Sequence, residues 1–152
     1  MRRQATISRE EETRAFIRMG TKRNPKYVPR PRLGMREGVK NRNKKAVAAF
    51  MGMASGHGPT ASYLTEKLKK DVSSQCPWCG GPDTRQHLLK SCKRWKEQIR
   101  KLWREIAGIL KVPVPKAKKM AIVEVFRRDE LTGVLMDFFE STKVGRWTDR
   151  PP

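Results

Sequence analysis

Four residues within a short stretch constrain the fold of this chain more than any other feature. Cys76, Cys79, His87 and Cys92 follow the spacing C-x2-C-x7-H-x4-C, and they include every cysteine of the chain. A tight turn between the first two lets backbone amides point at the sulfurs, and the first turns of a helix bring His87 and Cys92 toward one point. Three thiolates and one imidazole form a closed tetrahedral ligand set. The spacing therefore predicts one structural zinc ion, with no position left for a catalytic water.

Other interpretations of these residues explain less of the pattern. A set of buried thiols with a core histidine needs no such spacing. A redox C-x-x-C motif leaves His87 and Cys92 unexplained and lacks a βαβ context. A zinc deaminase needs H-x-E before P-C-x-x-C, but Gln75 precedes Cys76 and no glutamate follows His57 at the required position. An odd number of cysteines, with no secretory signal, also argues against a disulfide framework.

The charge of the chain indicates a polyanionic partner. Its 35 Lys and Arg outnumber 15 Asp and Glu, which gives a net charge of +20 and a pI near 10.6. The excess lies in two blocks, +11 over residues 1–45 and +9 over 76–119, whereas residues 120–152 carry −1. Nucleic acid is the usual partner of such a chain; an anionic membrane surface or solubility alone is the alternative. No apolar run is long enough to span a membrane.

The hydrophobic pattern predicts a small, mostly helical protein. Residues 1–45 have scattered apolar residues and several prolines, so we expect a basic, largely disordered arm with one short helix at 8–19. Residues 46–147 form the helical zinc-knuckle module, and residues 148–152 form a disordered end. Within the module, we expect helices at 45–54, 60–70, 93–111, 117–127 and 129–141, the last capped by Asp129. No strand pattern is convincing.

The helix predicted at 93–111 has the clearest amphipathic pattern in the chain. Its apolar stripe recurs with a period of 3.6 residues and includes Trp95 and Trp103, which favours a place in the core. The other face is basic and is the best candidate for phosphate contacts; the alternative is a solvated face, which would normally carry more acids. Its members are Lys93, Arg94, Lys96, Arg100, Lys101 and Arg104.

Two further residues near the knuckle have open roles. Trp78 lies inside the C-x2-C turn, where an exposed aromatic side chain can stack on an unpaired base. It can equally pack on the helix that contains Trp95, and the sequence does not decide between these roles. His57 lies between two glycines after a helix and lacks partner residues for catalysis, so we expect a capping or packing role.

These motifs together resemble the C-terminal tail of LINE-type (non-LTR) retrotransposon reverse transcriptases, over about 46–147. The residues that carry the resemblance are Gly56-His57, Tyr63-Leu64, Cys76-Pro77-Trp78-Cys79-Gly80, Asp83-Thr84, His87-Leu88-Leu89, Cys92 and Trp95. Neither the paired aspartates of that polymerase nor the carboxylates of a ribonuclease H are present. The resemblance therefore implies a zinc module that contacts nucleic acid, taken from such an element, left in a degraded copy, or adopted by a host.

We therefore expect a non-enzymatic module that binds RNA or single-stranded DNA, with no small-molecule substrate and no membrane association. Affinity would come from the arm and the basic helix face. An intracellular location is expected, with the nucleus favoured. The alternative is an assembly subunit of a larger ribonucleoprotein, in which the knuckle is purely structural and the helices at 117–141 form a docking surface. A translated remnant without a selected function is a third possibility.

Overall fold

The computed structural model describes residues 37–151, and within them the fold is small and mostly helical, as predicted. In chain order the elements are η1 (Glu37–Val39), α2 (Lys44–Ser55), α3 (Ala61–Glu66), α4 (Arg85–Lys90), η2 (Lys93–Trp95), α5 (Lys96–Leu110), α6 (Val114–Lys118), α7 (Ile122–Arg127), η3 (Asp129–Leu131) and α8 (Thr132–Ser141). The described residues contain no strand, only an isolated antiparallel bridge between Gln75 and Pro82. None of the described helices is long and apolar enough to span a bilayer. The helix predicted at 8–19 lies outside the described residues.

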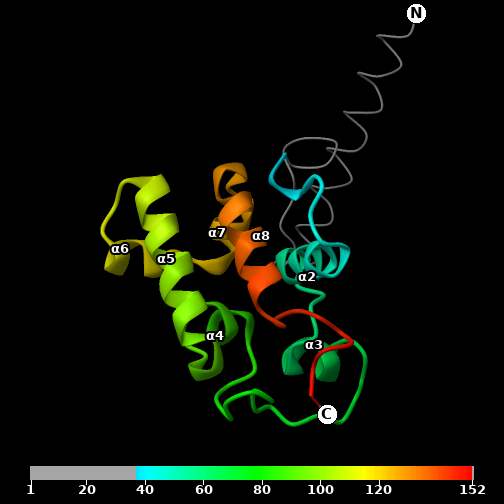
Figure 1. Cartoon of the computed structure of the whole chain (residues 1–152). Coiled ribbons are helices and arrows are strands. Elements are labelled where there is room, and N and C mark those ends of the chain that lie inside the picture. The colour runs from blue at the N-terminus through cyan, green and yellow to red at the C-terminus, as the bar shows by residue number, and fades with distance from the viewer. Residues whose placement is uncertain (1–36, 152) are drawn as a thin grey trace, which may run out of the picture.

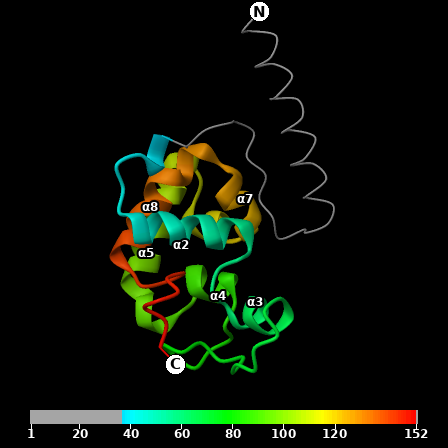
Figure 2. The same ribbon diagram turned by 90° about the vertical axis from the view of Figure 1, so that its right-hand side faces the viewer.

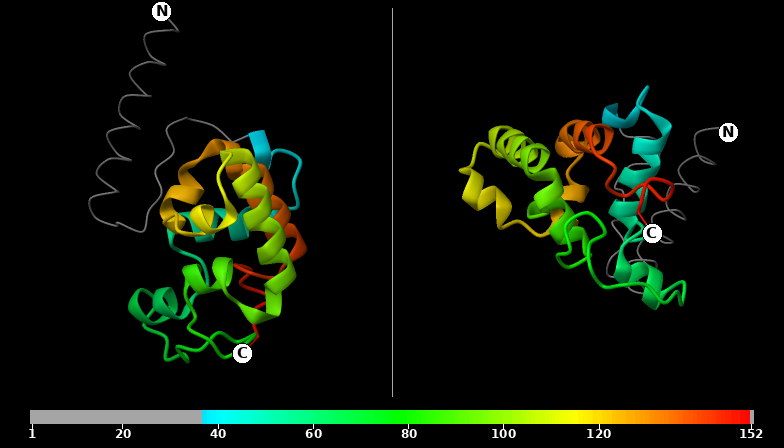
Figure 3. Two further views of the ribbon diagram at one scale, coloured as in Figure 1. Left: turned by 90° about the vertical axis from the view of Figure 1, so that its left-hand side faces the viewer. Right: turned by 60° about the horizontal axis from the view of Figure 1, so that its bottom comes forward.

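Helix α8 is the centre of the packing. It lies between α2 and α5 and contacts both, and η1 also packs against it (Figures 1 and 3). At one end of this helical layer are α3, α4 and the connection between them, together with the C-terminal segment (Figure 2). The molecule thus has a helical body and, at one end, a less regular region that contains the predicted metal ligands.

Aromatic side chains form the centre of the hydrophobic core of the body. Phe50 of α2, Phe126 of α7 and Phe139 of α8 are each at most 2% exposed. Their ring centroids lie 5.6 to 6.3 Å apart, within the range of favourable aromatic pairs. Leu135, Phe138 and Phe139 of α8 are buried in this core. The apolar side of the predicted 129–141 helix is therefore covered by the chain's own helices.

The first two predicted helices are confirmed, with shifted ends. Asn43 caps α2 through its side chain, which accepts hydrogen bonds from two backbone amides, and Gly56 ends it with φ +80°. Thr60 caps α3 as its position after a proline suggests. Helix α3 ends at Glu66 rather than at residue 70. The residues after it, Lys67 to Lys70, are all exposed, and Lys69 has a left-handed conformation with φ +53° that does not continue a helix.

The long amphipathic helix is confirmed, but its first turn is separate. Residues 93–95 form η2, and the regular helix α5 begins at Lys96. Its apolar stripe is buried as predicted, and Trp95 and Trp103 are 6% and 1% exposed. The helix ends at Leu110 because Lys111 adopts a left-handed conformation with φ +53°.

The predictions for residues 112–141 are partly wrong in detail. Instead of one helix at 117–127 there are two, α6 and α7. Helix α6 begins earlier than predicted, because Pro113 and Pro115 lie at the start of a helix rather than only ending the previous one. Asp129 does not cap the last helix. It lies inside η3, and Leu131 occupies the N-cap position of α8 without a side-chain hydrogen bond.

Both predicted boundaries of the module need correction. Residues 37–45 were assigned to the disordered arm, yet Val39 is buried and Arg42 forms ion pairs with Asp137 and Glu140 of α8, at 2.6 and 2.9 Å. The residues 148–151 were assigned to a disordered end, yet Arg150 pairs with Asp83 at 2.6 Å. Neither contact has a local sequence signal, because the paired residues are 95 and 67 positions apart.

Candidate metal centre

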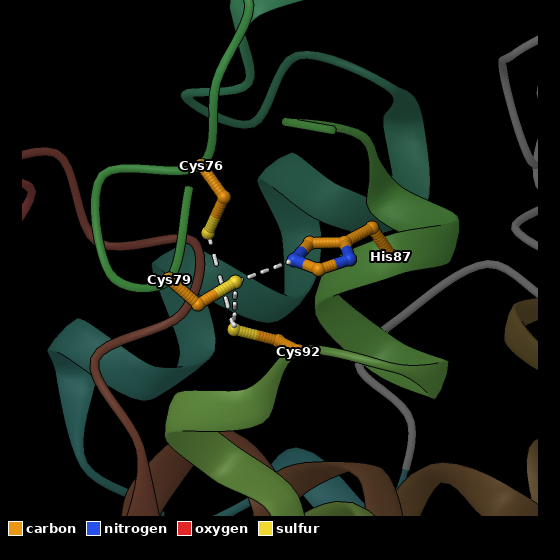
Figure 4. Close-up of side chains that lie close together, drawn as sticks. All are labelled: Cys76, Cys79, His87 and Cys92. Atoms are coloured by element: carbon orange, nitrogen blue, oxygen red, sulfur yellow. Dashed lines mark hydrogen bonds between the residues drawn. The ribbon is translucent and has the colours of Figure 1, made fainter. Parts of the chain in front are cut away.

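The four residues predicted as metal ligands converge on one point. Figure 4 shows the side chains of Cys76, Cys79, His87 and Cys92 directed toward each other. Their candidate ligand atoms all lie within 4.8 Å of one another. The Sγ atom of Cys92 is 3.9 Å from that of Cys76 and 3.6 Å from that of Cys79, and Nε2 of His87 is 3.1 Å from Sγ of Cys79. All three cysteines are free thiols.

A tight turn presents the first two thiols. The backbone N–H groups of Cys79 and Gly80 donate to the carbonyl oxygen of Cys76, at 3.3 and 2.8 Å. The N–H group of Cys76 donates to the carbonyl oxygen of Gly81 and closes the loop next to the bridge between Gln75 and Pro82. A side chain at Gly81 would place its Cβ atom 2.7 Å from Cε1 of His87. Only glycine therefore fits at position 81.

Helix α4 presents the imidazole. Thr84 caps this helix, since its hydroxyl oxygen accepts a hydrogen bond of 3.1 Å from the backbone N–H of His87. The Nδ1 atom of His87 is 3.2 Å from the hydroxyl of Ser91, which leaves Nε2 facing the sulfurs. A hydrogen bond on the second ring nitrogen is the usual way that a metal-ligating histidine is oriented. Cys92 follows directly after the helix.

Backbone amides and burial set the acidities of the thiols in opposite directions. Burial raises the pKa of Cys79, but hydrogen bonds from the backbone amides of Gly81 and Lys93 and from neighbouring side chains outweigh it, so that the pKa falls to about 6. Burial raises the pKa of Cys92 to about 12 and also raises that of Cys76. The cluster therefore holds one ready thiolate and two thiols that a cation would have to deprotonate.

The separations fit one tetrahedrally coordinated metal ion. Sulfur and nitrogen ligands at roughly 2.0–2.3 Å from a metal lie about 3.5–3.8 Å from each other, close to the distances between the sulfur atoms here. The same distances are far longer than a disulfide bond of about 2.05 Å. Cys76 and Cys92 are buried, and His87 is 7% exposed. The described residues thus contain a buried Cys3His cluster that can hold one metal ion.

The centre is fixed to the helical body by buried contacts. The indole Nε1–H of Trp103 donates to the carbonyl oxygen of Leu89 at 2.7 Å, and Leu88 and Leu89 are each 1% exposed. Arg85 donates to the carbonyl oxygen of Met53 at the end of α2, at 2.7 Å. Leu88 and Leu89 thus lie buried at the junction between the knuckle and the long helix α5.

An acidic residue of the knuckle makes a third attachment that the sequence did not reveal. The Oδ2 atom of Asp83 accepts hydrogen bonds from the backbone N–H of Ala61 at 2.7 Å and from Nη2 of Arg150 at 2.6 Å. Its side chain is fully buried. The contact ties the knuckle to the start of α3 and to the C-terminal segment. The only sequence signal was an isolated acid within a basic block.

The six predicted phosphate-contacting cations are exposed on η2 and α5. Arg100 pairs with Glu97 at 3.0 Å and Lys101 with Glu105 at 3.9 Å. The guanidinium of Arg94 lies 4.9 Å from the ring centroid of Trp95. The exposed set is Lys93, Arg94, Lys96, Arg100, Lys101 and Arg104.

Trp78 lies against the body rather than apart from it. Its ring packs edge to face with Trp95, with centroids 6.2 Å apart, and it is partly buried. His57 is outside the metal cluster. It follows α2, and its backbone N–H donates to the carbonyl oxygen of Gly52 within that helix. Its ring contacts that of Tyr63.

In comparisons with known proteins, no family model matches the chain, and no curated protein or solved structure is significantly similar to it. The resemblance to retrotransposon reverse transcriptases therefore stays a prediction from the residues that carry it.

Proposed function

We propose that this protein is a nucleic-acid-binding module for RNA or single-stranded DNA, stabilised by one structural zinc ion. The observation that carries the proposal is the junction between the metal cluster and the basic helix face. The backbone amides of Lys93 and Arg94 hydrogen-bond to the sulfurs of Cys79 and Cys92, respectively. The first two cations of the basic face thus belong to the same rigid unit as the metal ligands.

Zinc is the ion that this ligand set favours. Three thiolates and one imidazole form a soft, closed site, in which zinc needs no further ligand. Such a site contributes folding free energy on the order of 10–16 kcal/mol. That contribution matters here because the loop between α3 and α4 has almost no apolar core of its own. Of residues 71–82, Cys76 alone is buried.

Phosphate binding is supported by the balance of charge along η2, α5 and α6. Residues 93–119 contain ten Lys and Arg but only two Glu. Both glutamates lie on α5 and pair with cations of that helix, Arg100 and Lys101. The surplus of exposed cations, with the lysines of α6 beside α5, provides the sequence-independent contacts that dominate nucleic-acid affinity.

The first experiment tests the metal. Native mass spectrometry of the purified chain should find one zinc ion per molecule, and both Cys79→Ser and His87→Ala should lose it together with part of the helical circular dichroism. A matched control is His57→Ala, which removes the other histidine and should keep the ion. A native protein without metal would contradict the zinc assignment.

The second experiment tests the basic face by its salt dependence. Each phosphate contact contributes about −0.7 to the slope of log K against log salt for a single strand. Neutralising three cations that form no ion pair among the described residues should make the slope shallower by about 2. The variant carries glutamine at Lys93, Lys96 and Arg104. A control with the same loss of charge outside this face carries glutamine at Lys44, Lys45 and Lys143, which also form no ion pair among the described residues.

Comparing the two triple variants distinguishes binding by the basic face from binding by positive charge anywhere on the protein. An equal change of slope in both triple variants would mean that the basic face has no special role. No binding of RNA or single-stranded DNA by the native chain, even at low salt, would contradict the proposed function itself.

The alternative role as an assembly subunit gains no support from the helices at 117–141. A docking surface for a protein partner needs exposed apolar residues on these helices. Leu135 and Phe139 of α8 are instead buried, and α8 packs against α2 and α5. The proposal of a nucleic-acid-binding module remains the one that the exposed residues support best. It also agrees with the predicted nuclear location and with the resemblance to a retrotransposon tail.

A further inference from the structure

Three aromatic side chains form a row at the end of the molecule that contains the metal centre. The ring of Tyr63 lies between those of His57 and Trp147, with centroids 5.3 and 6.0 Å away. Both contacts are edge to face, at 86° and 75°. His57 follows α2, Tyr63 belongs to α3, and Trp147 lies in the segment after α8, so the row is assembled from three separate parts of the chain.

Trp147 differs from the other tryptophans in its exposure. It is 49% exposed, whereas Trp95 and Trp103 are buried and Trp78 packs on Trp95. A single exposed apolar residue needs no explanation by itself. Here, however, the ring is held by its contact with Tyr63, and about half of its surface stays exposed.

The backbone after α8 fixes the position of this tryptophan. Gly145 has φ +74°, and a Cβ atom there would lie 2.9 Å from Cγ of Met53 in α2. Val144 is fully buried, and Arg146 donates to the carbonyl oxygens of Phe139 and Glu140, at 3.0 and 3.3 Å. Trp147 therefore directly follows a segment that is packed against the helical body.

An open groove lies between Trp147 and the metal knuckle. Trp147, Lys70, Asp71 and Arg150 line it together with Cys76 and Pro77 of the C-x2-C turn. Lys67 and Lys69 precede Lys70 in the chain, and all three lysines are exposed and form no ion pair within the described part of the chain. The groove thus has an aromatic side chain of the row, a lysine and the first residues of the knuckle in one lining.

We infer that Tyr63 and Trp147 form a stacking platform for an unpaired nucleobase, with the adjacent phosphates bound by the lysines after α3. This inference rests on the proposed function and names a second contact region, distinct from the α5 face. The shared chemistry is a base with a free face followed by a phosphodiester, which RNA and single-stranded DNA both supply and a duplex does not. Aromatic stacking of this kind is tolerant of base identity.

The test compares strands with and without bases on the full chain. Fluorescence anisotropy would measure the binding of oligouridylate, oligothymidylate, a DNA duplex and an abasic strand of the same length. Trp147→Ala should weaken binding of the two base-containing single strands by about 5- to 150-fold per stacked base and leave the abasic strand unchanged. Trp147→Phe, which keeps an aromatic face, should retain most of the affinity.

A matched control removes an exposed apolar side chain elsewhere. Ile109 on α5 is 41% exposed and is not part of the aromatic row, so Ile109→Ala should bind all four ligands like the native chain. Circular dichroism and zinc content would confirm that each variant folds. If Trp147→Ala does not fold, the quenching of Trp147 fluorescence by oligouridylate, obtained by difference from Trp147→Phe, reports stacking directly.

Each outcome decides the inference. An equal loss on the abasic strand, or unchanged affinity of folded Trp147→Ala for both base-containing strands, would overturn it while the proposed function stands. No binding of any strand by the native chain would overturn both. A loss confined to oligouridylate or to oligothymidylate supports the platform and identifies which nucleic acid it serves.

Discussion

The buried pair of Asp83 and Arg150 gives a sharp prediction about stability. The carboxylate of Asp83 has no exposed surface, and among residues 37–151 Arg150 is its only charged partner, at 2.6 Å. Its Oδ1 atom has no hydrogen-bond partner in that part of the chain. Arg150→Gln would leave this charge buried with one backbone N–H as a donor. Removing one partner of a buried ion pair costs about 3–5 kcal/mol.

Thermal unfolding at constant zinc concentration would measure this cost. For a domain of this size, about 4 °C of Tm corresponds to 1 kcal/mol, so the expected decrease is roughly 10–20 °C. The exposed pair of Arg128 and Glu130, at 3.1 Å, provides the control. Because exposed pairs contribute about 0–1 kcal/mol, Arg128→Gln should change the Tm by a few degrees at most.

A double variant separates the lost contact from the stranded charge. Asp83→Asn with Arg150→Gln has no buried charge, and the amide oxygen can still accept the N–H of Ala61. It should recover most of the stability lost in Arg150→Gln alone. The reasoning is refuted if Arg150→Gln unfolds within about 0.5 kcal/mol of the native chain, or if the double variant is no more stable than the single one.

Two more predictions concern the metal centre, and one concerns α5. Burial raises the pKa of the Cys76 and Cys92 thiols, so zinc must displace their protons and its affinity should fall as the pH falls, as competition with a chelator at pH 8 and pH 6 would measure; an unchanged affinity would contradict this. Gly81→Ala should weaken zinc binding in a competition assay with a chelator, because its Cβ would lie 2.7 Å from the imidazole; unchanged affinity would refute this. Gly108→Ala, whose Cβ meets nothing within 4 Å, should instead raise the free energy of unfolding in urea by about 0.5–1 kcal/mol, and a decrease would contradict the open space seen there.

The sequence predicted what depends on local patterns. The period of 3.6 residues in α5 identified its buried stripe, and the short Cys/His spacing identified the cluster. Both work because the residues involved lie on one element or on two elements joined by a few residues. The apolar residues of α8 were also identified, although their partners were not.

The sequence could not predict contacts between distant segments. Arg42, which contacts α8, and Arg150, which contacts Asp83, are charged residues in segments with few apolar neighbours. The sequence pattern therefore predicts disordered ends for both. The aromatic row was missed for the same reason, since His57, Tyr63 and Trp147 come together only when three segments fold. The early start of α6 was missed because prolines can either end one helix or begin the next.

The difference between local and distant contacts also sets an order of events during synthesis. The thiols of Cys76 and Cys92 are 16 positions apart, whereas Asp83 reaches Arg150 across 67. Closing the short loop costs little entropy, so under the proposed function a nascent chain that has emerged past Cys92 would already be able to bind the ion. Trp147 is added later. A growing chain would then pass through a stage in which the ion is bound but the proposed stacking surface does not yet exist, and ribosome-stalled chains of different lengths would acquire the two properties at different points.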